Sequence, residues 1–211
     1  MEITITNAMK TIGKVCVLDN VSLTLHSGMV YGLQGPNGSG KTMLMRLVSG
    51  LIHPTTGTVW IDDKELGKDI DFPASMGLLL ENPAFLPGYT GRKNLELLAA
   101  IRNTISHEEI CQALIDVGLD PNDVRKYRKY SLGMKQRLGF AAAIMEKPQL
   151  IILDEPTNAL DSAGVEQICA LIRRERERGA LILLSCHSES TLYEMSDAIF
   201  TVVEGKVVKR L

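Results

Sequence analysis

Apolar and polar residues alternate along the first 30 positions of the chain, and this alternation predicts short β-strands. The strands lie in the segments ITIT and VCVLDNVSLTL, with turns at Gly13 and Gly28. A buried strand over residues 29–34 then runs into a glycine-rich loop, and a helical pattern covers residue 41 to about residue 51. A turn at residues 53–57 precedes a further half-buried strand, TVWIDD.

The pattern becomes helical from about residue 83 to residue 145, where apolar residues recur every three or four positions. After Pro148, strands and helices alternate. LIILD and LILLSC are apolar throughout, as expected of parallel strands covered on both faces, and VEQICALIRRERERG is an amphipathic helix closed by Gly179. AIFTVVEGKVV predicts a terminal hairpin. The sequence therefore predicts an α/β fold with a parallel-sheet core, an N-terminal β part and a helical insert.

Composition limits the functions that this fold can serve. The chain has 211 residues and a net charge of −2, which gives no electrostatic footprint for nucleic acid, so we expect no nucleic-acid partner. The four cysteines show no metal-ligand spacing and are expected to be reduced thiols of a cytoplasmic protein. No apolar run approaches the roughly 20 residues that span a bilayer, and the N-terminus has a strand pattern rather than that of a signal peptide. We expect no direct membrane insertion, and any membrane role to depend on a partner.

A phosphate-binding loop is the strongest chemical signal, because it matches G-x-x-x-x-G-K-[ST] in full. Glycines let backbone N–H groups converge on phosphate oxygens, and the helix that follows directs its positive end toward the same anion. Lys41 supplies a charge for the β- and γ-phosphates, and Thr42 offers a hydroxyl to Mg²⁺. The predicted nucleotide-binding residues here are Gly35, Pro36, Asn37, Gly38, Ser39, Gly40, Lys41 and Thr42.

Two carboxylates end the apolar run LIIL and complete the nucleotide-binding signal. Asp154 can hold Mg²⁺, and Glu155 is then placed to orient or deprotonate an attacking water. Acidic residues often follow strands, so the pair gains its meaning from the phosphate loop. Together the two motifs predict a protein that binds a nucleoside triphosphate with Mg²⁺, without naming the family.

A third motif names the family. Residues 130–138 read Tyr-Ser-Leu-Gly-Met-Lys-Gln-Arg-Leu and resemble the signature of ABC transporter ATPases, which usually reads Leu-Ser-Gly-Gly-Gln. The serine and the second glycine match, and the other positions differ. This version is similar to that of the bacitracin- and lantibiotic-type antibiotic exporters. Ser131 is expected to cap a helix whose free N–H groups face a γ-phosphate held by another subunit.

The resemblance covers nearly the whole chain and implies a P-loop NTPase core with a parallel central sheet, an N-terminal antiparallel β subdomain and an inserted α-helical subdomain. It implies a single ABC ATPase domain over residues 1–211. Residues 1 to about 80 and 146–211 form the ATP-binding core, and about residues 82–145 form the helical subdomain. The implied cofactors are ATP and Mg²⁺.

The resemblance also implies roles for three further residues. Asp161 follows the carboxylates as the family's D-loop does, so it acts across a dimer interface, caps the next helix, or does both. His187 follows LILLSC, where the family places a switch histidine that contacts the γ-phosphate. Glu81 stands where the family usually has glutamine, and its carboxylate could reach Mg²⁺ or a water bound to it. Glu155, His187 and Lys41 are the expected catalytic residues.

The base-binding part departs from the family, whose members often stack adenine on an aromatic residue. Residues 11–15 hold no aromatic side chain, and Ile12 offers only apolar contact to the base. We therefore expect modest discrimination between ATP and GTP.

Two partners are implied. The first is a second copy of the chain, whose Ser131, Leu132, Gly133 and Met134 face the nucleotide held by the phosphate loop of the first copy. The second is a transmembrane permease subunit, and this partner places the protein at the cytoplasmic face of the cell membrane. The resemblance implies that ATP hydrolysis by the chain powers transport through the permease, in the export direction for an antimicrobial peptide or antibiotic. Residues 83–89 are either a docking loop for this partner or a surface loop held by its prolines.

Three other classes of protein fit the sequence less well. An ABC-type ATPase acting on ribosomes or DNA usually has two such domains or long coiled coils, and 211 residues leave no room for either. A small-molecule kinase would need an acceptor site and a lid, and would have no use for Ser131. A non-catalytic binding module is disfavoured by the intact set of Lys41, Asp154, Glu155 and His187.

Overall fold

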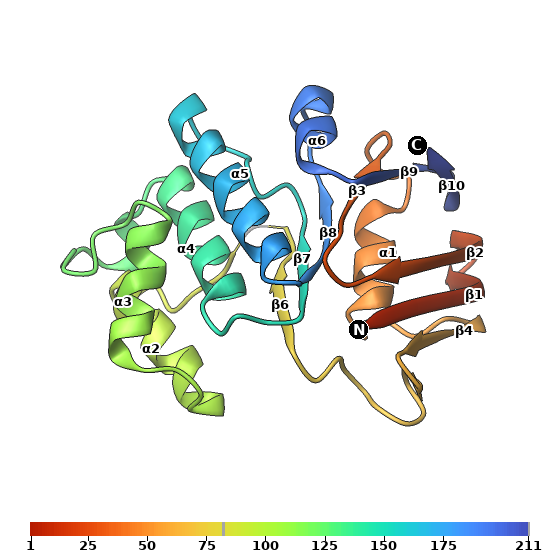
Figure 1. The fold of residues 1–211 in the computed structure, drawn as a ribbon, viewed down its shortest axis with the longest axis horizontal. Coiled ribbons are helices and arrows are strands. Elements are labelled where there is room, and N and C mark those ends of the chain that lie inside the picture. Colours follow the sequence, from red (N-terminus) through yellow and green to blue (C-terminus); the bar gives the residue numbers. More distant parts are fainter. Residues whose placement is uncertain (82, 211) are drawn as a thin grey trace.

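Two β-sheets and a set of helices form the fold, which the computed structural model describes for residues 1–81 and 83–210 (Figure 1). The expected subdomain boundary at residue 82 and the chain end at residue 211 lie outside these described residues. In the described part of the chain, no helix is both long enough and apolar enough to cross a bilayer.

The smaller sheet is antiparallel, with the strand order β2-β1-β4-β5. Strand β1 (Glu2–Ile12) pairs with β2 (Val15–His26) on one side and with β4 (Thr56–Ile61) on the other, and β5 (Lys64–Glu65) pairs with β4. Gly13 allows the tight turn between β1 and β2, because its φ of +59° lies in the left-handed region that glycine adopts without strain. The N-terminal part is therefore the expected antiparallel β unit.

The larger sheet has the order β10-β9-β3-β8-β7-β6, and all neighbours pair in parallel except β9 and β10. This confirms the predicted parallel core and its terminal hairpin. The strands are β3 (Val30–Gln34), β6 (Met76–Leu79), β7 (Leu150–Leu153), β8 (Leu181–Ser185), β9 (Ala198–Val203) and β10 (Lys206–Arg210).

Helix α1 (Lys41–Val48) packs between the two sheets, and the remaining helices lie on the other side of the larger sheet, some against it and others farther out (Figure 1). Each side has its own hydrophobic cluster, so the large sheet is buried on both faces. The other helical elements are α2 (Gly91–Arg102), α3 (His107–Asp116), the short 3-10 turn η1 (Tyr127–Lys129), α4 (Leu132–Ile144), α5 (Ser162–Glu177) and α6 (Glu189–Met195).

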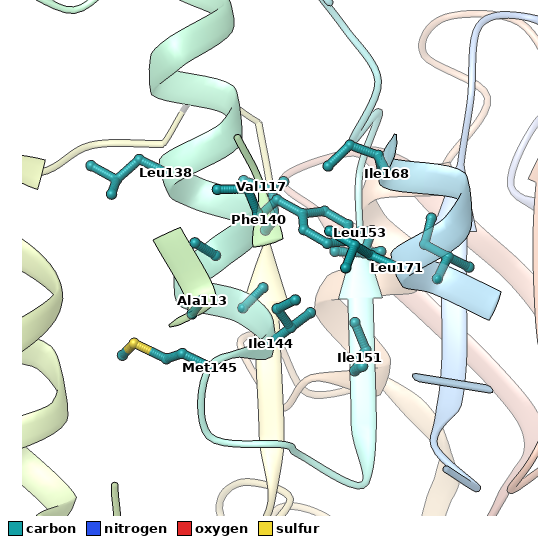
Figure 2. Packing of buried hydrophobic residues seen from close by; sticks show 14 of the residues in the cluster. Ala113, Val117, Leu138, Phe140, Ile144, Met145, Ile151, Leu153, Ile168 and Leu171 are labelled. Atoms are coloured by element: carbon teal, nitrogen blue, oxygen red, sulfur yellow. The ribbon is translucent and has the colours of Figure 1, made fainter. Parts of the chain in front are cut away.

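Strand β7 shows why its sequence is apolar without alternation. Leu150 and Ile152 belong to the cluster around α1, whereas Ile151 and Leu153 belong to the cluster on the opposite face. On that face Leu153 packs with Phe140 of α4, which is fully buried (Figure 2). Because both faces are covered, every side chain of the strand leaves water, as expected for a central parallel strand.

Helix α4 approaches the sheet very closely at β6. A Cβ atom on Gly77 would lie 1.7 Å from the carbonyl oxygen of Ala143, near the end of α4. Only a residue without a side chain fits at this position. The contact fixes the height of α4 above the sheet, and α4 begins directly after Ser131.

The elements differ from the sequence-based prediction at several places, among them the end of α1 and the unpredicted elements β6 and α6. Helix α1 ends at Val48 rather than near residue 51, because Gly50 adopts a φ of +80° that cannot continue a helix. Helix α6 was not predicted; it is short, and Ser188 caps its N-terminus by accepting a hydrogen bond from the Thr191 N–H at 3.3 Å.

Candidate nucleotide site

A cavity of about 520 Å³ opens at the carboxyl ends of β3 and β7, beside the N-terminus of α1. In a parallel sheet this edge is the usual place for a ligand. The residues lining the cavity include Lys41, Thr42, Glu81, Asp154 and Glu155. Residues separated by more than 100 positions in the sequence therefore meet in one site.

The phosphate loop has the backbone that its glycines allow. Gly38 and Gly40 have φ values of +78° and +113°, and a Cβ atom on Gly35 would lie 2.2 Å from the carbonyl oxygen of Val202. The ammonium group of Lys41 donates hydrogen bonds to the carbonyl oxygens of Gly35 at 2.7 Å and Pro36 at 3.0 Å. The loop thus encloses its own lysine, within reach of any anion bound there.

Ser39 adds an observation that fits a phosphate ligand. Its side chain is buried, and its Oγ has no hydrogen-bond partner within residues 1–81 and 83–210. A buried hydroxyl without a partner is costly unless a ligand completes it. Together with the open N-terminus of α1 and Lys41, the loop offers donors of the kind that phosphate oxygens require.

Thr42 and Asp154 form the pair expected to hold Mg²⁺. The Thr42 hydroxyl donates to Asp154 Oδ2 at 2.7 Å, so both oxygens already lie side by side. Asp154 is largely buried, and its other oxygen, Oδ1, accepts a hydrogen bond from the Ser185 hydroxyl at 2.6 Å. Hydroxyl and carboxylate oxygens are ligands that Mg²⁺ prefers, so this pair fits the ion.

Glu155 is held by three neighbours. Its backbone N–H donates to Ser185 Oγ at 3.0 Å, and its carbonyl oxygen accepts a hydrogen bond from Gln136 of α4 at 2.9 Å. Its carboxylate lies 3.0 Å from His187 Nε2. Glu155 has a backbone φ of +52°, which is uncommon for residues other than glycine and asparagine. The three contacts stabilise this conformation.

Glu81 also lines the cavity, but its carboxylate is engaged elsewhere. Its Oε1 accepts a hydrogen bond from Arg46 of α1 at 2.6 Å. To bind Mg²⁺, the Glu81 carboxylate would have to leave Arg46, or bind Arg46 and the ion at the same time.

The signature residues lie at the start of α4. Ser131 caps this helix by accepting a hydrogen bond from the Met134 N–H at 3.2 Å. Gly133 lies against the loop that follows Glu155, because a Cβ there would be 2.9 Å from the carbonyl oxygen of Ala159. The lining of the cavity includes Gln136, but none of Ser131, Leu132, Gly133 and Met134. Within one chain, residues 131–134 therefore do not line the nucleotide cavity.

Asp161 has the local role expected of it. Its side chain accepts a hydrogen bond from the Gly164 N–H at 3.0 Å and caps α5. It also lies 3.7 Å from Arg137 of α4. A role across a dimer interface remains compatible with this position, since the Asp161 side chain is 77% exposed.

The base end of the cavity is lined by Val15, Cys16 and Val17 of β2, with Glu204 and Gly205 of the β9–β10 turn. Ile12 pairs with Val15 across the β1–β2 turn but does not line the cavity. Val15 is therefore nearer to the cavity than Ile12, and the base contact of Ile12 stays a prediction that the cavity lining does not support.

Sequence reasoning missed Ser185 and Gln136. Both lie within longer apolar or helical segments, and the sequence pattern gives no sign that they contact Glu155.

Tyr127 and Tyr130 lie just before the start of α4. Burial raises the pKa of both phenols, which keeps them protonated.

Comparison with known proteins shows a family match and several similar sequences. A family model described as ABC transporter matches residues 18–158. The chain is 44% identical over 205 residues to the ABC transporter ATP-binding protein YybJ of Bacillus subtilis (strain 168), covering 97% of this chain and 94% of YybJ. It is 38% identical over 207 residues to the bacitracin transport ATP-binding protein BcrA of Enterococcus faecalis, covering 97% and 67% of the two chains.

A lantibiotic transport ATP-binding protein, SrtF of Streptococcus pyogenes, is 34% identical over 205 residues, covering 97% of this chain and 88% of SrtF. Among solved structures, the dimeric post-hydrolysis state of the ATP-binding cassette MJ0796 bound to ADP and Pi has a TM-score of 0.87 and 25% identity, covering 99% of this chain and 97% of that one. The fold of this chain is thus that of ATP-binding cassettes.

Proposed function

Because the chain belongs to the ABC transporter family, we propose that it works as one of two ATP-hydrolysing subunits that drive a separate transmembrane permease. It is an ABC transporter ATP-binding subunit with ATPase activity. The observation that carries the proposal is the convergence of Lys41, Thr42, Asp154 and Glu155 on one cavity whose lining omits the signature residues of the same chain.

The active site is proposed to be composite. The phosphate loop of one copy holds the ATP phosphates, and Thr42 and Asp154 would hold Mg²⁺, which would supply positive charge to neutralise the phosphates. Ser131 and Gly133 of the second copy close the site. The Met134 N–H is engaged by the Ser131 side chain, whereas the N–H groups of Leu132 and Gly133 precede the first helical hydrogen bonds and can face an anion. The dimeric MJ0796 cassette with ADP and Pi supports this arrangement.

The chemistry is hydrolysis. A water molecule attacks the γ-phosphorus, the bond from that phosphorus to the oxygen of ADP breaks, and Glu155 accepts the proton of the water. Lys41 stabilises charge on the transferred group, and His187 contacts the γ-phosphate from beside Glu155. Loss of the γ-phosphate removes the ligand that both copies share, so the two copies separate.

A groove beside the nucleotide cavity suits the permease. It has a volume of about 520 Å³ and is lined mostly by apolar residues, among them Leu51, Phe85 and Leu98. Glu81 lines both this groove and the nucleotide cavity, so a segment seated in the groove would touch a residue at the nucleotide. We assign the groove to a cytoplasmic segment of the permease, bordered by the loop of residues 83–89.

Export of an antimicrobial peptide or antibiotic is the proposed use, supported by the names of the relatives BcrA and SrtF. The test is the growth of a strain lacking the chain and its permease on bacitracin and on lantibiotics. Increased sensitivity that is reversed by the permease together with the parental chain, and not by the permease together with Glu155→Gln, supports export. Unchanged sensitivity to all of these compounds removes the proposed cargo, but leaves the ATPase assignment intact.

The composite site is tested by steady-state Mg·ATP hydrolysis as a function of protein concentration. Turnover per subunit that rises with concentration supports two copies per site. Turnover that is constant has two explanations, a preformed dimer or a self-contained site, and sizing Glu155→Gln with ATP decides between them. A monomer with ATP and constant turnover would contradict the proposal.

A further inference from the structure

Ser185, the last residue of β8, connects the two carboxylate-bearing residues of the site. Its hydroxyl donates to Asp154 Oδ1 at 2.6 Å and accepts a hydrogen bond from the Glu155 N–H at 3.0 Å. Its side chain is fully buried. The Ser185 hydroxyl thus uses its hydrogen to bind Asp154 and a lone pair to bind Glu155, two consecutive residues at the end of β7.

The sheet register creates this contact. Strands β7 and β8 run in parallel, with Leu153 opposite Leu184, so Ser185, the last residue of β8, lies beside Asp154, the residue that follows β7. An apolar residue at position 185 would satisfy the pattern of LILLSC equally well. It would leave one Asp154 oxygen and the Glu155 N–H without their partner in a buried place.

We propose that Ser185 is a positioning residue for ATP hydrolysis, whose hydroxyl orients the Asp154 carboxylate toward Mg²⁺ and holds the Glu155 backbone in its left-handed conformation. The inference rests on the proposed roles of Asp154 and Glu155.

The consequence for Asp154 follows from its two oxygens. Because Oδ1 is engaged by Ser185, Oδ2 remains directed toward Thr42, 2.7 Å away, where the ion would be held. Without the Ser185 hydroxyl, the carboxylate can rotate, and the oxygen that faces Thr42 is no longer fixed. The affinity for Mg²⁺ in the presence of nucleotide should then fall, while the phosphate loop still binds nucleotide without the ion.

The consequence for Glu155 follows from its backbone. Its φ of +52° is supported by Ser185 on the N–H side and by Gln136 on the carbonyl side. Losing the first of these supports allows the carboxylate to move away from the water that it should activate. A shift of about 1 Å at a catalytic group can slow a reaction on the order of a hundredfold.

The test compares Ser185→Ala with Ser185→Thr, which keeps the hydroxyl, and with Ser49→Ala as a matched control. Ser49 is also fully buried, and its hydroxyl donates to the Arg46 carbonyl oxygen at 3.0 Å, away from the carboxylates. The measurements are the melting temperature, ADP binding in EDTA, the Mg²⁺ concentration that half-saturates the ion-dependent part of ADP binding, and kcat.

For Ser185→Ala we expect ADP binding in EDTA within about twofold of the parent, half-saturation by Mg²⁺ raised about fivefold or more, and kcat lowered about tenfold or more. Ser185→Thr should restore both values toward the parent, and Ser49→Ala should change the melting temperature alone. Should Ser185→Ala fail to fold, Ser185→Cys, a weaker donor, must show an intermediate Mg²⁺ requirement.

A parental Mg²⁺ requirement and kcat in Ser185→Ala, or in the cysteine variant where that is the one measured, would overturn the inference. Equal effects of Ser185→Ala and Ser49→Ala on the Mg²⁺ requirement would do the same. Failure of the proposed function itself is seen separately, as a parental rate in Glu155→Gln or a parental Mg²⁺ requirement in Asp154→Asn.

Discussion

His187 Nε2 lies 3.0 Å from the Glu155 carboxylate, although the two residues follow different strands and are 32 positions apart. The contact joins the end of β8 to the end of β7. Glu155 lines the nucleotide cavity, and both residues line a smaller cavity next to it. An imidazole that is 64% exposed is free to turn between this carboxylate and a bound γ-phosphate. The pair therefore links the proposed proton acceptor, Glu155, to the residue proposed to contact the γ-phosphate, His187.

Glu155→Gln should bind ATP at the parental affinity and hydrolyse it at least about a hundredfold more slowly, because the amide cannot take the proton of the attacking water. The ATP-bound dimer should accumulate. Steady-state hydrolysis and size-exclusion chromatography with ATP measure both effects. Glu166→Gln, an exposed position on α5, is the matched control and should behave as the parent. A parental rate in Glu155→Gln would show that this carboxylate is not the base.

His187→Ala should lower kcat at least about tenfold with little change in ATP binding, because the variant loses a contact made to the reacting phosphate. His107→Ala is a close control: His107 is also more than half exposed and also lies beside a glutamate, with Nδ1 3.4 Å from Glu96. The kcat of His107→Ala should be parental. Equal effects of the two variants would remove His187 from the mechanism.

Glu81→Ala should raise the Mg²⁺ concentration needed for half-maximal hydrolysis, if the carboxylate reaches the ion or its water. Arg46→Met separates this role from the ion pair, because it frees the Glu81 carboxylate without removing it. We expect the Mg²⁺ requirement to rise in Glu81→Ala and to stay parental or fall in Arg46→Met. An unchanged requirement in Glu81→Ala would leave the ion pair as the role of this residue.

ATP and GTP should bind with affinities within about tenfold of each other, a free-energy difference of about 1.4 kcal/mol or less, because no aromatic ring lines the base end of the cavity. Equilibrium titration of both nucleotides measures this ratio. Val15→Tyr should tighten ATP binding by stacking, and Ile12→Tyr should do so less, since Val15 lines the cavity and Ile12 does not. A strong ATP preference in the parent, or a larger gain from Ile12→Tyr, would contradict these assignments.

Gly77→Ala should lower the free energy of unfolding by about 3 kcal/mol or more, because the added Cβ meets the Ala143 carbonyl oxygen at 1.7 Å and pushes α4 off β6. Gly88→Ala is the control, since a Cβ there has open space and no positive φ to strain it. Its stability should stay within about 0.5 kcal/mol of the parent in urea unfolding. Equal stabilities of the two variants would mean that α4 can shift at no cost.

Much of the site could be predicted from the sequence because its chemistry is local. The spacing from Gly35 to Thr42 fixes a loop backbone and a helix start within eight residues, and Asp154 and Glu155 end a strand whose burial its composition reveals. The capping serine and aspartate, Ser131 and Asp161, are also local signals, because a side chain that accepts from an N–H three residues ahead needs no distant partner.

The remaining features depend on contacts between distant segments. In the sequence, Ser185 is simply a polar residue at the end of an apolar strand. The β7–β8 register brings its hydroxyl into contact with both Asp154 and Glu155. Likewise, the direction of a strand turn decides that Val15 rather than Ile12 lines the cavity. The sequence by itself determined most of the elements, the fold class and the phosphate chemistry, since these follow from short-range backbone preferences and the period of the hydrophobic pattern. Only the tertiary structure decided which neighbours hold those groups in place, because close packing selects such pairs across the whole chain at once.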